Sequence, residues 1–379
     1  MSAPEPIALP NPPNDGITSL QYIDNSSRQL LASTSWDGAL RLHDTSAKTH
    51  VTTHVMECGP LLSMTSPSSS SKVYTGGIDG SIRQFDIATS TASLIGMHGA
   101  NSNSSGSDDA NKKVACSTLS TIHDSSSLIA SAGWDAKFHL WDVRCSSSTT
   151  NNNKHQPVIT LDLPGKAFGM DTSRDGTKVV VATSGRKNCF IDVRSSSLLA
   201  EEVTNDKENS NQPPPPPPIA NMLLQRDSSL KYQTRCIKFF PSTQGIAIGS
   251  IEGRVAIEYL ADIGIPNPEN KKKYAFKCHR VNDTIYPVND IAFHPTHGTF
   301  ATGGADGTVV TWDGQSKKKL TNLAKLPTSI ACLAFNRDGT ELAMASSYTF
   351  EEGERDHPRE EIYVREILEG EVKPKVVAK

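Results

Sequence analysis

Short apolar runs separated by turn-forming residues recur along the chain, and the clearest set lies between Tyr274 and Asp313. Three runs there are rich in β-branched and aromatic residues and predict strands: Val288–Phe293, Thr299–Gly304 and Thr308–Trp312. Asp306-Gly307 supplies a tight turn between the second and third runs. An antiparallel meander that ends in Trp-Asp, with a His about one strand upstream, is typical of a β-propeller blade.

The same pattern repeats elsewhere and predicts seven blades. The six further segments are Gly16–Asp44, Gly59–Asp86, Val114–Asp142, Ala167–Val193, Thr234–Leu260, and Ile330–Ser347 with Glu361–Ile367. The acidic turn residue recurs at Asp37, Asp79, Asp135, Glu252 and Asp306, whereas the fourth segment has an Asp175-Gly176 turn and no Trp. We therefore predict an all-β, seven-bladed WD-repeat β-propeller that forms a single domain over 1–379. A blade cannot bury both of its faces alone, so the ring must close, and we expect an N-terminal strand around Glu5–Leu9 to complete the last blade.

Several segments between the blades have low complexity. Residues 99–113 and Cys145–Asn153 are rich in Ser and Asn, and residues 195–230 contain the six prolines Pro213–Pro218. We expect 99–113 and 195–230 to be disordered loop insertions and 368–379 to be a flexible tail. The proline run favours polyproline II, which can bind an aromatic-lined adaptor domain or act as a spacer.

Composition excludes some classes of function. Hydrophobic residues make up 36% of the chain, charged residues 21%, and the net charge is −3, so no overall charge favours nucleic acid or a membrane. Seven cysteines are scattered without a CxxC pair, which predicts reduced thiols in an intracellular compartment. The chain also lacks an apolar signal core near Met1 and a run long enough to span a bilayer.

No catalytic constellation is present in the sequence. It contains no GxSxG, HExxH or GxxxxGK[ST] motif. Histidines such as His43, His98, His279 and His294 occupy separate repeat positions rather than metal-ligand spacing. We therefore expect no enzymatic activity, no cofactor and no metal site.

Apolar residues at the predicted turns are candidates for a binding surface. Trp141 and Trp312 close third strands and belong to the predicted core, whereas Trp36 and Trp134 directly precede the turn aspartate. Since these turns open onto one end of a propeller, the residues at and next to them should share one face: Trp36, Ile78, Trp134, Ile251, Glu252 and Arg254. Large apolar side chains gathered on one face indicate a binding surface, although each indole could instead cover a neighbouring blade.

Basic residues cluster near the fifth and sixth blades. Lys271–Lys273, Lys277 and Arg280 lead into the sixth blade, and Arg235 and Lys238 lie on the preceding strand. Such a run can be a solvated face or a nucleic-acid site, but no stacking aromatics accompany it. A compact acidic target, carboxylate or phosphate, fits better because Arg pairs with either group through two hydrogen bonds.

These residues also carry a family resemblance. The strings SIEGRVAIEYL, KKKYAFKCHR, IYPVNDIAFHPTHGTFATGGADGTVVTWD and LAMASSYTFEEGE resemble the Bub-three family, the WD-repeat subunit of the mitotic spindle assembly checkpoint. The resemblance covers essentially all blades, is densest from Tyr232 to Tyr348, and leaves out the loops 99–113 and 195–230. A sister family, the messenger-RNA export factor called Rae-one or Gle-two, shares EGRVAI, FKCHR and AFHP, whereas YPVN, GGADG and KLPTSIACLAF are closer to the checkpoint family.

The resemblance implies a non-enzymatic adaptor in the nucleus and, in mitosis, at the kinetochore. Family members bind the GLEBS segment of the checkpoint kinase Bub and its Mad-type relative, with acidic residues on the position of Arg254 and apolar ones on Trp36 and Trp134. They also bind phosphorylated Met-Glu-Leu-Thr repeats of the kinetochore scaffold, where Lys277 matches the main phosphate partner and Arg280 and Arg235 are further candidates. Some relatives have Arg at Lys277, so the bidentate fork is lost here.

Three further expectations complete the resemblance. His279 is expected to orient the turn residue Asp306 through a structural hydrogen bond. Lys207-Glu208-Asn209 resembles a KEN degron, which an anaphase-promoting complex activator would read, although so short a match also arises by chance. The chain is expected to be a monomeric propeller within hetero-complexes, with no membrane contact and no direct DNA binding, and messenger-RNA export at the nuclear pore is the alternative function.

Overall fold

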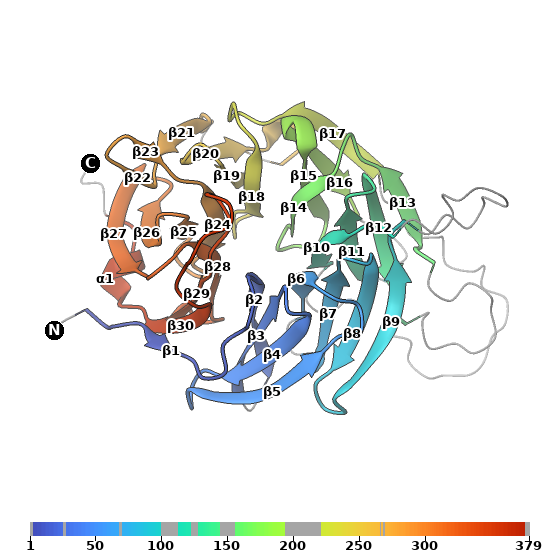
Figure 1. Ribbon diagram of the computed structural model, residues 1–379. Coiled ribbons are helices and arrows are strands. Elements are labelled where there is room, and N and C mark those ends of the chain that lie inside the picture. The colour runs from blue at the N-terminus through green and yellow to red at the C-terminus, as the bar shows by residue number, and fades with distance from the viewer. Residues whose placement is uncertain are drawn as a thin grey trace, which may run out of the picture.

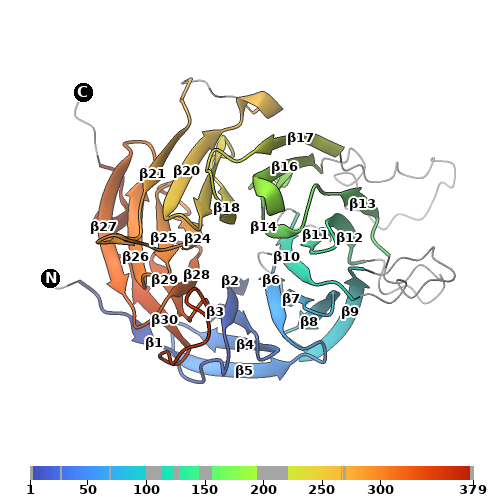
Figure 2. The ribbon, with the colours of Figure 1, turned by 45° about the horizontal axis from the view of Figure 1, so that its top comes forward.

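The computed structural model describes residues 3–25, 28–67, 70–99, 113–122, 128–144, 156–193, 221–265, 267 and 270–375. Seven four-stranded antiparallel sheets surround a central opening, as Figures 1 and 2 show from two directions. The predicted seven-bladed propeller is therefore confirmed.

Each blade is an antiparallel meander, and its strands follow one another from the ring axis outward. The first three blades contain β2 (Ile17–Asn25), β3 (Arg28–Ser35), β4 (Ala39–Asp44) and β5 (Thr49–Val55); β6 (Leu61–Thr65), β7 (Lys72–Gly77), β8 (Ser81–Asp86) and β9 (Thr91–Met97); and β10 (Cys116–Thr121), β11 (Leu128–Gly133), β12 (Lys137–Asp142) and β13 (Ile159–Asp162). The next two contain β14 (Ala167–Thr172), β15 (Lys178–Thr183), β16 (Lys187–Asp192) and β17 (Asn221–Asp227); and β18 (Thr234–Phe239), β19 (Gly245–Ser250), β20 (Arg254–Tyr259) and β21 (Tyr274–Lys277).

The sixth blade contains β24 (Val288–Phe293), β25 (Phe300–Gly304), β26 (Thr308–Asp313) and β27 (Lys318–Lys325), and the seventh contains β28 (Ile330–Phe335), β29 (Glu341–Ser346), β30 (Glu361–Glu366) and β1 (Ile7–Ala8). A small hairpin, β22 (Arg280–Val281) with β23 (Thr284–Ile285), lies between the fifth and sixth blades. Helical structure within the described ranges is limited to the 3-10 turns Ser184–Arg186 and Ala261–Ile263 and to α1 (Glu369–Val372). None of the described helices is long and apolar enough to cross a bilayer.

The core consists of seven apolar clusters, each of which joins two neighbouring blades. One cluster, for example, combines Ile23 and Leu42 of the first blade with Leu61 and Phe85 of the second. Another joins the last blade to the first, because Ile17 and Leu31 share it with Val364. No blade is buried on both faces without its neighbours, which is the reason that the ring has to be complete.

The N-terminal segment closes the ring, as the sequence predicted. β1 pairs antiparallel with β30, with Ile7 opposite Val364, and Leu9 donates its N–H to the Ile362 carbonyl at 2.8 Å. The first and last parts of the chain therefore share one sheet (Figure 1).

Four sequence expectations differ from the structure. The segment 195–230 was expected to be a loop, but its described part contains β17, the outer strand of the fourth blade. The tail 368–379 begins with α1, whose Val372 is buried against the core of the sixth and seventh blades. Tyr274–Lys277 belongs to the fifth blade rather than the sixth, because β21 pairs with β20. Asp175 joins β14 to β15, so its turn is at the opposite end of the blade from the turn that contains Asp37.

Other expectations concern residues that the structure does not describe. Residues 100–112, Cys145–Asn153, 194–220 with the prolines Pro213–Pro218, the motif Lys207-Glu208-Asn209, and residues 376–379 all lie outside the described ranges.

Candidate binding face

One backbone hydrogen bond recurs in every blade and defines one face of the ring. The residue after the second strand donates its N–H to the carbonyl of the residue before the first strand, at 2.8–3.1 Å. The seven donors are Trp36, Ile78, Trp134, Ser184, Ile251, Ala305 and Ser347. Because the bond is the same in each blade, these side chains surround the central channel at one end, which we call the turn face.

Large apolar side chains on the turn face are exposed. Trp36 is 42% exposed, Ile251 41% and Trp134 36%, and Ile78 is half-buried. Trp36 lies over the loop that follows β1, where a Cβ added to Gly16 would be 3.2 Å from its ring. The two indoles and two isoleucines therefore share one face, and Trp36, Trp134 and Ile251 present accessible surface there.

At four of the seven positions the next residue is an aspartate, which holds the turn in shape. The carboxylates of Asp37, Asp79, Asp135 and Asp306 each accept the backbone N–H two residues later, at 2.9–3.1 Å. This is an Asx turn, and it directs the preceding side chain away from the sheet. In the fifth blade Glu252 occupies the position instead.

Charged groups gather around the turn of the fifth blade. Arg254 Nε lies 3.4 Å from Glu252 Oε2, Arg280 donates from Nη2 to the Glu252 carbonyl at 2.9 Å, and Lys277 is the cross-strand partner of Arg254. We call Ile251, Glu252, Arg254, Lys277 and Arg280 the blade-five turn patch. Lys277 is exposed, and the other four side chains are exposed or half-buried.

Three buried polar atoms of this patch lack a hydrogen-bond partner among the described residues: Arg254 Nε, Arg280 Nε and Glu252 Oε1. Buried polar groups are normally paired, because an unpaired one costs about 1–3 kcal/mol. These three atoms lie beside exposed Ile251, so polar groups and an apolar side chain adjoin at this turn.

Apolar residues that the sequence analysis did not single out extend the patch. Tyr232, Val281 and Ile285 are exposed, and Ile285 lies against the turn, because a Cβ added to Gly253 would be 3.1 Å from its Cγ2. Their signal in the sequence is weak, since the hairpin β22–β23 has only two residues in each strand.

Arg235 is separated from the other two candidate phosphate ligands. It lies on β18, the innermost strand of the blade, whereas Lys277 lies on β21, the outermost. Three strand spacings of about 4.8 Å put the backbones of these two strands about 14 Å apart. Arg235 instead donates from Nε to Asn289 Oδ1 at 3.2 Å at the mouth of the central channel.

Lys238, which the sequence grouped with the basic residues, points into the channel. It lies 3.8 Å from Asp171, whose other oxygen accepts the Phe239 N–H at 2.7 Å. Asp290 of the next blade also lines the channel and accepts the Leu333 N–H at 2.8 Å. These three charged residues lie on the inner strands of three neighbouring blades, apart from the blade-five turn patch.

His279 belongs to a structural hydrogen-bond relay. His279 Nδ1 lies 2.9 Å from Asp306 Oδ1 and its Nε2 lies 2.8 Å from Thr302 Oγ1, which also accepts from Trp312 Nε1 at 2.9 Å. The expected role of His279 in orienting Asp306 is therefore confirmed. Burial alone would raise the pKa of Asp306, but its bonds from His279 outweigh burial and lower the pKa.

Comparisons with known proteins agree with this geometry. The model of the WD domain, G-beta repeat, matches residues 7–44 and 270–313. The mitotic checkpoint protein bub3 of Dictyostelium discoideum is 37% identical over 362 residues, which cover 94% of this chain and 93% of that protein. The mitotic checkpoint protein BUB3.1 of Arabidopsis thaliana is 38% identical over 97% of this chain and 94% of its own length. A poly(A)+ RNA export protein of Schizosaccharomyces pombe is 29% identical, over 97% of this chain and 92% of its own.

The identity of the checkpoint relatives, together with their coverage of nearly the whole ring, decides between the two families that the sequence resembles. The chain belongs to the Bub3 family of mitotic checkpoint WD-repeat proteins.

Proposed function

We propose that this protein is a non-enzymatic adaptor that holds GLEBS segments of checkpoint kinases, a Bub kinase and its Mad-type relative, on the turn face. The observation that carries the proposal is the blade-five turn patch, where the half-buried guanidinium of Arg254 stands beside exposed Ile251. An acidic residue of the segment would accept from the half-buried guanidinium of Arg254, and its apolar residues would cover Trp36, Ile78 and Trp134. The Bub3 names of the relatives support this partner class.

The GLEBS prediction concerns one charge. Arg254→Glu should weaken a GLEBS peptide at least about tenfold, because a charge-assisted hydrogen bond is replaced by repulsion between like charges. Isothermal titration calorimetry on the full chain measures the change.

Arg174→Glu is the matched control, since exposed Arg174 lies in the β14–β15 turn at the opposite end of the ring. Thermal unfolding should be the same for both variants. Full peptide affinity in a folded Arg254→Glu protein would show that the peptide binds elsewhere.

The second part of the proposal is recruitment to phosphorylated Met-Glu-Leu-Thr repeats of the kinetochore scaffold, which would place the adaptor in the nucleus and at kinetochores. A phosphothreonine carries a charge of about −1.5 to −2, so a few charge-assisted hydrogen bonds decide whether it binds. Lys277 and Arg280 flank one turn and can share a phosphate, and Arg235, on the innermost strand of the same blade, is a further candidate.

A phosphorylated repeat peptide should therefore bind more tightly than the unphosphorylated one, and Lys277→Glu should remove this preference. Lys272→Glu tests whether the general positive potential suffices, because Lys272 is exposed in the same basic run without belonging to the patch. Calorimetry with both peptides on all three proteins gives the answer. Equal affinities of the wild type for the two peptides would eliminate the phosphate site.

A second candidate function is messenger-RNA export, favoured by the 29% identity to the poly(A)+ RNA export protein. The same face would then bind a GLEBS segment of a nucleoporin. We place this function second because the checkpoint relatives are more similar to the chain.

A further inference from the structure

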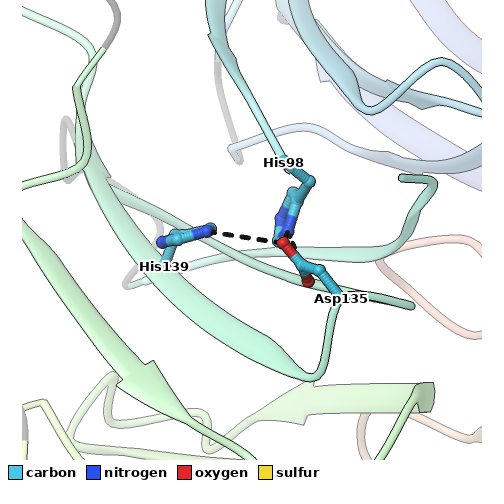
Figure 3. A group of neighbouring side chains, drawn as sticks. All are labelled: His98, Asp135 and His139. Atoms are coloured by element: carbon cyan, nitrogen blue, oxygen red, sulfur yellow. Dashed lines mark hydrogen bonds and ion pairs between the residues drawn. The ribbon is translucent and has the colours of Figure 1, made fainter. Parts of the chain in front are cut away.

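The third blade contains a histidine beyond those of the structural relay. Its relay matches that of the sixth blade: His98 Nδ1 lies 3.1 Å from Asp135, and His98 Nε2 lies 2.7 Å from Ser131 Oγ, which accepts from Trp141 Nε1 at 2.8 Å. His139 on β12 joins this group, as Figure 3 shows. The sequence analysis missed it because 98 and 139 are far apart in the chain.

The three side chains have the spacing of metal ligands. His98 Nδ1, a carboxylate oxygen of Asp135 and His139 Nε2 all lie within 4.8 Å of one another. Two of the separations are 3.1 Å, from His98 Nδ1 to Asp135 Oδ2, and 4.0 Å, from His139 Nε2 to the same oxygen. Ligand bonds of about 2.0–2.2 Å put the ligand atoms of a tetrahedral zinc site roughly 3.3 Å apart, so only small side-chain movements are needed.

His139 faces the carboxylate with a nitrogen that a metal could use. Its Nδ1 lies 2.8 Å from Thr160 Oγ1, so a tautomer with the proton on Nδ1 donates to Thr160 and leaves the Nε2 lone pair toward Asp135. A second hydrogen bond that fixes the tautomer in this way is typical of metal-bound histidines.

We propose that His98 Nδ1, Asp135 and His139 Nε2 form a binding site for a divalent transition metal ion, specifically Zn²⁺, with a fourth position open to water. Two imidazoles and one carboxylate are a ligand set that suits zinc. The site lies directly beneath Trp134 on the turn face, since Asp135 follows Trp134 in the chain.

Binding requires one proton to move. In the relay His98 donates from Nδ1 to Asp135, so zinc must replace this proton. The neutral ring keeps one proton by taking the other tautomer, in which Nε2–H donates to Ser131 Oγ. Asp135 retains its bonds from the backbone N–H groups of Lys137 and Gly99, at 3.1 and 3.2 Å, which hold the carboxylate in place.

The sixth blade is an internal control for this site. It has the same relay of Asp306, His279, Thr302 and Trp312, but Val310 occupies the position of His139. The equivalence follows from register, because Val310 pairs with Thr302 as His139 pairs with Ser131. The sixth blade should therefore bind no zinc, and one substitution in each blade exchanges the two environments.

The experiment titrates ZnCl₂ into the full chain after chelator treatment, near neutral pH, by calorimetry. His139→Val should lose one equivalent of zinc and keep its thermal stability without metal, since valine fills the same position in the sixth blade. Val310→His should gain one equivalent, which a structural role of His139 alone would not predict. Other histidines contribute equally to all three proteins. The same number of bound zinc ions in wild type and His139→Val would overturn the proposal.

Discussion

The residue that follows the second strand of each blade is held in place by its backbone hydrogen bond, whereas its side chain can vary. Its N–H bond to the start of the blade does not depend on which side chain it carries, so tryptophan, isoleucine, serine and alanine all occur at equivalent positions. Selection for binding can therefore act on these positions without disturbing the ring. This explains how Trp36 and Trp134 can be exposed in a fold whose other described tryptophans, Trp141 and Trp312, are buried or half-buried.

His43 makes stability depend on pH. Burial lowers the pKa of His43 to about 4, against the opposing effect of its 2.9 Å bond to the Pro10 carbonyl. The unfolded chain gains a proton near pH 6.5, whereas folded His43 does not until about pH 4, so the free energy of unfolding should fall as pH decreases between these values. The loss is about 3 kcal/mol over the whole window.

Denaturant unfolding of the wild type and His43→Gln at several values between these pH limits measures this effect. The variant should show a smaller decrease, because glutamine does not titrate, while His139 and His294, whose pKa values burial also lowers, contribute in the same direction to both proteins. Parallel pH profiles would contradict the assignment to His43.

At the scale of elements, the sequence predicted the inner three strands of each blade better than the outer one. Inner strands such as β19 are buried along their whole length and read as continuous apolar runs. Outer strands alternate between exposed and half-buried residues, as in β5 and β17, and their polar composition does not distinguish them from loops. Tyr274–Lys277 was therefore assigned to the wrong blade and β17 to an insertion.

The candidate site, like the strands, could be predicted from the sequence only in part. Turn residues on one face could be predicted because every repeat puts its turn at the same end. Other features depend on which strand of a blade each residue occupies. These are the separation of Arg235 from Lys277, the position of Lys238 inside the channel, and the contact of His98 with the group that contains His139. A linear spacing does not contain this information.

The C-terminal helix α1 is bonded to the last blade, which is in turn bonded to the N-terminal segment. Arg365 of β30 is buried and donates from both Nη atoms to Glu371 at 2.9 and 2.7 Å, and from Nε to the Pro4 carbonyl at 2.9 Å. Glu371 belongs to α1, and its backbone carbonyl accepts a hydrogen bond from Thr311 Oγ1 at 2.8 Å. One guanidinium thus connects the N-terminal segment, the last blade and the C-terminal helix.

Glu371→Gln should destabilise the protein by about 3 kcal/mol, because it leaves a buried guanidinium without its counter-charge. Glu369→Gln is the matched control on the same helix, since the ion pair of Glu369 with Lys373 is exposed, and it should change stability little. Chemical denaturation with both variants measures the difference. Equal stability of the two variants would show that α1 does not lock the ring.

At the scale of the whole molecule, stability and partner binding depend on different regions of the ring. Seven inter-blade clusters supply the stability, and the turn face carries the candidate partner contacts. The basic run Lys271–Lys273, with Lys277 and Arg280, lies at the junction of the fifth and sixth blades, while the net charge of the chain is −3. Such a distribution favours one compact anion over a long polyanion.

This distribution predicts how the checkpoint and export functions can be told apart. A GLEBS peptide that uses Arg254 should lose little affinity between about 50 and 200 mM salt, whereas RNA that neutralises six or more phosphates would lose about a thousandfold or more. Fluorescence anisotropy with labelled peptide and labelled poly(A) RNA on the same protein measures both slopes. We expect peptide binding with a shallow slope and no saturable RNA binding at the higher salt, with Lys272→Glu as a control that lowers non-specific RNA attraction but spares the peptide. Saturable poly(A) binding with a steep slope, lost in Lys277→Glu, would instead favour export, because the blade-five turn patch would then belong to an RNA surface.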